Sequence, residues 1–142
     1  MKKLSFLFAT ILLITVSCAK KDAADQIYNT TWELEYITGP RIAFDGLYPT
    51  KKPQLTFDKE TKKATGNNGC NGYSAEFTLG EENAISFGEA GPTTMMYCGQ
   101  GEQVFLKTIK KINKYSFDIE GKLNLLMDDV TMMRFKKVTT EE

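Results

Sequence analysis

The sequence predicts an α+β protein that is mostly β, with a strongly curved antiparallel sheet or a small barrel and one helix in the C-terminal third. Short runs of alternating apolar and polar residues recur along most of the chain, which is typical of half-buried strands. Glycine, asparagine and proline separate these runs and predict tight turns between them. One stretch, residues 102–113, changes to helical spacing, with Phe105, Ile109 and Ile112 on one face.

The N-terminus has the features of an export signal. Lys2 and Lys3 precede an apolar run over residues 4–16, so residues 1–17 are predicted to be a signal peptide. The run is shorter than the roughly 20 residues that span a membrane. It ends at Thr15-Val16-Ser17-Cys18, which resembles the lipobox of bacterial lipoproteins and predicts a lipid on Cys18. The alternative is an ordinary signal peptide with an incidental cysteine.

A lipid on Cys18 would anchor the protein to a membrane of the bacterial cell envelope. We expect the outer membrane, on its periplasmic or surface side. The polar residues that follow carry no apolar period, so residues 18–29 are predicted to be a flexible tether. The folded domain is then expected over residues 30–138, followed by a polar tail, 139–142.

Composition excludes several classes of function. The chain has 18 basic and 18 acidic residues, and removal of Lys2 and Lys3 with the signal peptide leaves 16 against 18. No large basic field remains for nucleic acid. Histidine is absent, which excludes Ser-His-Asp and Cys-His catalysis and histidine-ligated zinc. We therefore predict no catalytic, cofactor-binding or metal-binding residues.

Besides Cys18, the chain contains only Cys70 and Cys98. Two thiols are too few for a four-thiolate zinc site. An even pair in an exported domain predicts a disulfide instead, because the compartment is oxidising. The alternative is a pair of reduced, buried thiols that pack as small apolar groups.

The strands follow one another with short turns. The first begins at Thr31 and is expected to place Trp32, Leu34 and Tyr36 on one face. Residues 39–53 contain several breakers, and we expect a flap whose apolar residues lie on the domain; the alternative is an insertion without function. The later strands are predicted at 54–58, 64–66, 73–79, 84–87, 93–97, 115–119, 123–125 and 130–137.

The turn at residues 66–73, Gly-Asn-Asn-Gly-Cys-Asn-Gly-Tyr, is the most distinctive stretch. Its glycines favour positive φ, and its asparagines are expected to bond their own backbone rather than leave the amides free for an anion.

The methionine pairs 95,96 and 132,133 suggest a copper(I) site bound by thioether sulfurs. Adjacent strand residues point to opposite faces, however, so packing is the favoured role. Asp128 and Asp129 are adjacent in sequence, which is poor geometry for the acid and base pair of a glycosidase, because the two carboxyl groups must flank one bond.

Charges along the predicted helix suit its dipole. Glu102 lies in the first turn, and Lys110, Lys111 and Lys114 lie near the C-terminal end. The alternative for these lysines is a patch for anionic membranes, which usually needs four to eight basic residues. We therefore expect a solvated helix face.

Several ordered motifs carry a family resemblance. Gly-Cys-Asn-Gly-Tyr at 69–73 is followed by Thr-x-Met-x-Tyr-Cys at 93–98, and both lie among Thr-Trp-Glu-Leu at 31–34, Leu-Thr-Phe-Asp at 55–58 and Glu-x-x-Phe-Leu at 102–106. This pattern resembles the META domain, or HslJ-like, family from about residue 30 to 135. The structural-motif residues that the resemblance identifies are Gly69, Asn71, Gly72, Tyr73, Thr93 and Met95.

The resemblance implies a small mixed domain of bacterial envelope proteins, associated with heat stress, antibiotic tolerance and, in parasites, virulence. It implies no known enzymatic reaction. We expect a monomeric interaction or structural module with an envelope protein as partner. The alternative is a carrier that holds a lipid or small hydrophobic ligand in its barrel. A filled interior favours the first function, and an apolar cavity of about 300 Å³ or more favours the second.

Overall fold

The computed structural model describes residues 23–91 and 96–138, and the predicted signal peptide, Cys18, Thr93, Met95 and the tail 139–142 lie outside these ranges. Three α-helices, one 3-10 turn (η1) and eight strands make up the described chain. In order they are α1 Ala23–Ile27, β1 Thr31–Ile37, α2 Phe44–Leu47, β2 Gln54–Phe57, β3 Lys63–Asn67, β4 Gly72–Leu79, η1 Glu81–Asn83, β5 Ile85–Phe87, α3 Gly101–Ile109, β6 Lys114–Phe117, β7 Leu123–Met127 and β8 Val130–Lys137.

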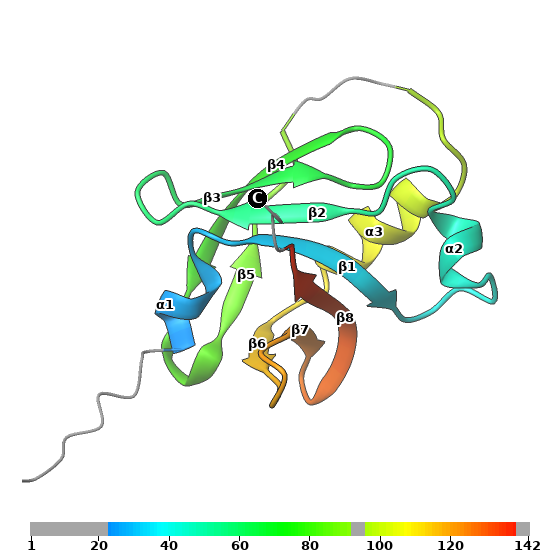
Figure 1. The fold of residues 1–142 in the computed structure, drawn as a ribbon. Coiled ribbons are helices and arrows are strands. Elements are labelled where there is room, and N and C mark those ends of the chain that lie inside the picture. The colour runs from blue at the N-terminus through cyan, green and yellow to red at the C-terminus, as the bar shows by residue number, and fades with distance from the viewer. Residues whose placement is uncertain (1–22, 92–95, 139–142) are drawn as a thin grey trace, which may run out of the picture.

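The eight strands form one antiparallel sheet that curls into a nearly closed barrel (Figure 1). Their order is β5-β4-β3-β2-β1-β8-β7-β6, so β5 and β6 are the two edges. These edges meet at one bridge between Ala84 and Lys114, and the Ile85 N–H donates to the Asn113 carbonyl at 3.1 Å. The predicted fold class, a mostly β domain with a strongly curved sheet, is confirmed.

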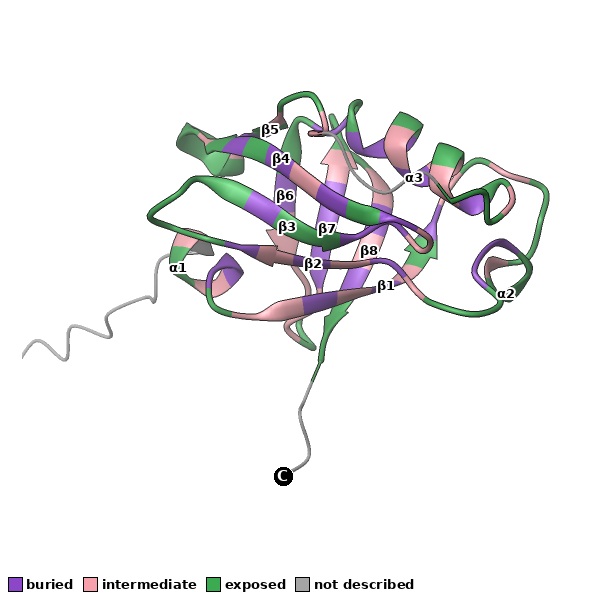
Figure 2. Cartoon of the chain, turned by 90° about the horizontal axis from the view of Figure 1, so that it is seen from above, coloured by how far each residue is buried: buried purple, intermediate pink, exposed green. Residues whose placement is uncertain are grey.

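Buried and more exposed residues alternate along most of the strands (Figure 2), and the buried side chains form one hydrophobic core. The helix α3 adds Phe105 and Ile109, which are both buried, and the Phe105 ring packs edge-on against Tyr73 with centroids 5.4 Å apart. The largest side chains with less than 2% exposure are Trp32, Phe57, Phe105, Phe135, Ile27, Leu34, Leu55, Ile85, Ile109, Leu123, Leu125 and Met133.

The domain starts earlier than the sequence predicted. Residues 23–28 were expected to belong to the flexible tether 18–29, but they form α1 and then pack on the barrel. Ile27 is fully buried, and its carbonyl accepts a hydrogen bond from the Trp32 indole at 3.0 Å. Tyr28 forms a parallel bridge with Phe57. The tether prediction is wrong for these residues because the apolar pair Ile27 and Tyr28 is too short to show a period.

A β-bulge changes which residues of β1 face the core. The pairing of β1 with β8 shifts between Leu34 and Tyr36, so Glu35 is the extra residue. Trp32 and Leu34 point inward as predicted, whereas Tyr36 is 41% exposed and Ile37 is buried in its place. The prediction of Tyr36 on the inner face is therefore wrong.

Two further predicted elements differ in extent. The helix spans Gly101–Ile109 rather than 102–113, and the Lys111 N–H turns back to the Thr108 carbonyl at 3.0 Å. Ile112 is buried all the same, from the turn that follows. Of the strand predicted at 93–97, the described residues Met96 and Tyr97 are irregular. In the described chain no helix combines the length and the apolar character needed to cross a bilayer.

Candidate functional site

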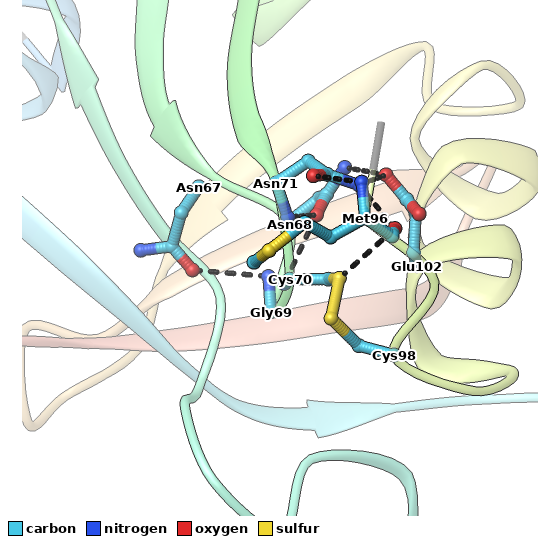
Figure 3. The surroundings of a disulfide bond; sticks show 8 residues. All are labelled: Asn67, Asn68, Gly69, Cys70, Asn71, Met96, Cys98 and Glu102. Atoms are coloured by element: carbon cyan, nitrogen blue, oxygen red, sulfur yellow. Dashed lines mark hydrogen bonds between the residues drawn. A yellow bond between two sulfur atoms is a disulfide. The ribbon is translucent and has the colours of Figure 1, made fainter. Parts of the chain in front are cut away.

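The two predicted cysteine segments meet at the end of the barrel where α3 begins (Figure 3). Cys70, in the turn between β3 and β4, forms a disulfide with Cys98, whose Cα lies 5.7 Å away. Cys98 is exposed and Cys70 is half-buried. We call the residues gathered here, 67–71, 96–98, Gly101 and Glu102, the disulfide face.

The asparagines of the turn bond their own backbone. The Asn67 side-chain oxygen accepts the Gly69 N–H at 3.0 Å. The Asn68 side-chain oxygen accepts the N–H groups of Cys70 at 3.1 Å and of Asn71 at 2.8 Å. Asn67, Asn68 and Asn71 are all buried, which raises the cost of leaving any of these groups unbonded. The backbone amides of Gly69, Cys70 and Asn71 are thus occupied within the protein.

Asn71 reaches across to the segment that carries Cys98. Its side-chain oxygen accepts the Met96 N–H at 2.9 Å, and its side-chain amide donates to the Met96 carbonyl at 2.8 Å. The Cys70 sulfur lies 3.3 Å from the same carbonyl oxygen. The side chain of Asn71 therefore completes for Met96 the pair of bonds that a neighbouring strand would supply.

Glu102 ties the turn to the helix. Its Oε1 accepts hydrogen bonds from the side-chain amides of Asn68 at 2.7 Å and Asn71 at 2.9 Å. The carboxylate also lies in the first turn of α3, where the helix dipole favours negative charge. Its neighbours in Figure 3 are amides, backbone and a disulfide, none of which is an acid or a base near neutral pH. This arrangement suits a rigid surface better than proton transfer.

Tyr48 joins a third part of the chain to the disulfide face. Its hydroxyl donates to the Gly101 carbonyl at 3.0 Å, and burial raises the pKa of this phenol. A Cβ added to Gly69 would lie 2.5 Å from a ring carbon of Tyr48, and one added to Gly101 would collide with the Leu47 carbonyl and the same ring. Both positions therefore require glycine.

No pattern in the sequence indicated this role of Tyr48. It was one apolar residue among several in the 39–53 segment. Of the apolar residues of this segment, Leu47 and Tyr48 are buried on the domain as predicted, whereas Ile42 is 43% exposed, so the prediction is wrong for that residue.

The predicted motif residues divide between this face and the core. Cys70 and Cys98 form the predicted disulfide, and Gly69 and Asn71 lie beside Cys70 in the same turn. Gly72 begins β4 in open space, where an added Cβ would meet nothing within 4 Å. The Tyr73 side chain is 4% exposed and packs in the core, and burial raises the pKa of its phenol.

The segment between the Asn71 bonds and the disulfide is exposed. Met96 is 62% exposed and Tyr97 is 90% exposed. Asn71 holds the backbone at Met96, and the disulfide holds it at Cys98. A large aromatic side chain is thus presented to solvent from a backbone that is fixed on both sides.

Two hollows elsewhere on the surface have sizes suited to small ligands. One, of about 360 Å³, is lined by Tyr28, Phe77 and Leu79 together with Lys62 and Glu76. The other, of about 380 Å³, is lined largely by polar residues and glycines of 63, 74–76, 88, 89 and 91. Among the described residues, no three histidine, cysteine or acidic side chains are grouped to hold a metal ion.

Comparison with known proteins agrees with the fold. A solved NMR structure of a protein from Burkholderia xenovorans is similar, with a TM-score of 0.62 and 24% sequence identity over 82% of this chain and 87% of that one. No curated protein matches the sequence. The model of the META domain family matches residues 25–139, from within α1 to just past β8. With that match over most of its length, the chain belongs to the META domain family.

Proposed function

We propose that the protein is a non-enzymatic interaction module of the bacterial cell envelope, held at the membrane by a lipid on Cys18, and that it binds an envelope protein through the disulfide face. The observation that carries this proposal is the contrast between the interior and that face. The interior is occupied by large apolar side chains, whereas the disulfide face presents Tyr97 from a fixed backbone.

Tyr97 has the properties of an interface anchor. Tyrosine offers a large contact area with a polar tip, and it loses little conformational entropy on binding. The disulfide and the Asn71 bonds lower the entropic cost further, because the backbone on both sides is already ordered. Met96, beside it, adds a flexible apolar side chain that adapts to a partner surface.

Family membership supports the proposed biological role. We place the module in envelope stress or antibiotic tolerance, the processes that the resemblance implies. Carriage of a lipid or a hydrophobic drug is the competing function. The two hollows have the necessary volume, but each carries charged side chains in its lining, which fit an apolar ligand poorly. These are Lys62 and Glu76 in the first hollow, and Lys63, Glu76 and Glu89 in the second.

A comparative capture experiment tests the proposal. Full-length protein and two variants, Tyr97→Ala and Tyr36→Ala, are purified from solubilised membranes of stressed cells. Tyr36 is the matched control, since it is an exposed tyrosine on β1 and is not one of the residues of the disulfide face. We expect one envelope protein to be enriched with the wild type and with Tyr36→Ala, and to be recovered roughly tenfold less with Tyr97→Ala.

Two results would contradict the proposal. Equal recovery of every co-purified protein with Tyr97→Ala would show that the disulfide face is not the binding surface. A lipid bound stoichiometrically to the purified protein in native mass spectrometry, with no enriched protein, would favour the carrier instead.

A further inference from the structure

The segment between β1 and β2 is attached to the rest of the protein at few points. We call residues 39–52 the strap. Its backbone hydrogen bonds are local: the N–H groups of Gly46 and Leu47 donate to Ala43, and that of Tyr48 donates to Phe44. Among the described residues, one hydrogen bond joins the strap to the barrel, from the Tyr48 hydroxyl to the Gly101 carbonyl.

The packing of side chains also attaches the strap to the rest of the protein at few residues. Within the strap only Leu47 and Tyr48 are buried, and residues 41–43, 45 and 46 are exposed. The ring of Phe44 packs on Tyr48 at 5.2 Å and Lys52 lies over the Phe44 ring, so these contacts stay within the strap. The strap therefore has internal order of its own, and it docks on the core through the side chains of Leu47 and Tyr48, with Phe44 packed beside them.

Both ends of the strap are fixed. The Thr38 N–H donates to the Met132 carbonyl at 2.9 Å, and the Pro53 carbonyl accepts the Leu34 N–H at 2.9 Å. Just inside the first anchor, Gly39 has a φ of +116°, a conformation that glycine adopts without strain, and no atom lies within 4 Å of where its Cβ would be. Glycine at such a position is suited to act as a hinge.

From this arrangement we propose that the strap undocks from the barrel as a unit, and that the Tyr48 side chain is the main contact that holds it in the docked state. Opening breaks one hydrogen bond and exposes Leu47 and Tyr48, while the eight-stranded sheet stays intact. Segments with so few tertiary contacts open at much lower free energy than the whole domain. The open state uncovers the slot between Gly69 and Gly101, beside Cys70.

The slot matches a phenol in shape and polarity. Gly69 and Gly101 both lie close to the Cδ1 and Cε1 atoms of the Tyr48 ring, and the Gly101 carbonyl accepts the hydroxyl. A tyrosine of the envelope partner would fit it in the same way, so the strap acts as an autoinhibitory contact on the disulfide face. This last step rests on the proposed function, whereas undocking itself needs no partner.

Hydrogen exchange of the purified full-length protein tests undocking directly. Three variants are compared with the wild type: Tyr48→Phe removes only the hydroxyl, Gly101→Ala places a methyl group against the ring, and Tyr36→Phe is the matched control. We expect the amides of Gly46, Leu47 and Tyr48 to exchange in the wild type with little dependence on denaturant, unlike those of β1 and β8. Tyr48→Phe should accelerate strap exchange roughly fivefold, since one hydrogen bond is lost. Gly101→Ala should accelerate it more, and Tyr36→Phe should leave it unchanged.

Undocking is contradicted if the strap amides exchange only through global unfolding, with the denaturant dependence of β1. It is also contradicted if Tyr48→Phe accelerates hydrogen exchange in the strap and in the sheet by the same factor.

A synthetic tyrosine-containing peptide tests the slot separately. It should bind Gly101→Ala less well than the wild type if the slot receives a phenol, and equal binding would remove the autoinhibitory role while leaving the undocking result in place.

Discussion

Asn71 and Met96 are joined by two reciprocal hydrogen bonds, one in each direction between the amide side chain of Asn71 and the backbone of Met96. The neighbouring residues Cys70 and Cys98 are joined covalently. The hydrogen bonds and the disulfide thus fix the same segment independently, on the two sides of Tyr97. The hydrogen bonds between Asn71 and Met96 keep the cysteines near each other in the native state, which favours the disulfide over the reduced pair.

Replacing Asn71 by alanine should destabilise the protein by about 2–4 kcal/mol. The variant leaves the Met96 N–H without its partner and removes one of the two amides bonded to Glu102, in a buried setting. Asn113→Ala is the matched control, because Asn113 makes a similar reciprocal pair with Asp128 in an exposed position. We expect a loss of less than about 1 kcal/mol there. Urea unfolding measures both, and equal losses would contradict the role assigned to Asn71.

Loss of the disulfide should cost about 3 kcal/mol. The bridge joins residues 28 apart in sequence, and it restricts the unfolded chain accordingly. The double variant Cys70→Ser, Cys98→Ser should therefore unfold at a clearly lower urea concentration, with the fold retained. Thiol titration of the chain carrying Cys18→Ser, in denaturant without reductant, should find no reactive thiol. Two reactive thiols would show that the turn is held by packing and by Asn71 alone.

Stability should fall in acid in part through Glu35. Burial raises the pKa of this carboxyl, but hydrogen bonds and charges from Arg134 at 2.7 Å and Lys122 at 3.2 Å outweigh it, so the pKa lies below its usual 4.5. The folded state then binds the proton less readily than the unfolded state. The stabilisation is complete above about pH 5 and is lost as the pH falls through the folded pKa.

The test is a comparison of Glu35→Gln with the wild type at several pH values. The variant should be less stable at pH 7 and should approach the wild type near pH 3. Glu76→Gln is a suitable control, since Glu76 is exposed on β4 and makes no ion pair in the described chain. A Glu35→Gln deficit that stays constant from pH 7 to pH 3 would contradict the assignment.

Local pattern predicted the strands well because one face of each strand is buried. Leu55 and Phe57, or Ala75 and Phe77, alternate with polar neighbours, and this alternation is visible in the sequence. The bulge at Glu35 was not predictable in the same way. It depends on the pairing of β1 with β8, about a hundred residues later, and a shift of one residue moves Tyr36 outward.

The candidate site was predicted only in part, because some of its contacts are local in sequence and others join distant segments. The turn chemistry of Asn67, Asn68 and Gly69 is local, so residue type alone indicated it. The bonds of Asn71 to Met96 and of Tyr48 to Gly101 join distant segments through side chains whose types are common in other roles. Only the folded chain shows which asparagine and which tyrosine make them.

The membrane anchor remains a prediction from the N-terminal sequence. If Cys18 carries a lipid, cells fed a fatty-acid analogue should label the wild type but not Cys18→Ser, and the variant should leave the membrane fraction. Two or more acyl chains hold a protein firmly, whereas one chain holds it marginally. An unlabelled wild type, or a Cys18→Ser variant that stays equally membrane-bound, would contradict lipid attachment.

Site-specific photo-crosslinking in intact cells tests most directly whether the disulfide face binds a protein. A photoreactive amino acid is placed at Tyr97 and, in a separate strain, at Tyr36 on β1. We expect one discrete protein adduct from Tyr97 and none from Tyr36. The Tyr97 adduct should weaken when Asn71→Ala is added, because only the disulfide then holds the presenting segment. The same adducts from both positions, or none from Tyr97 under heat or antibiotic stress, would contradict binding through the disulfide face.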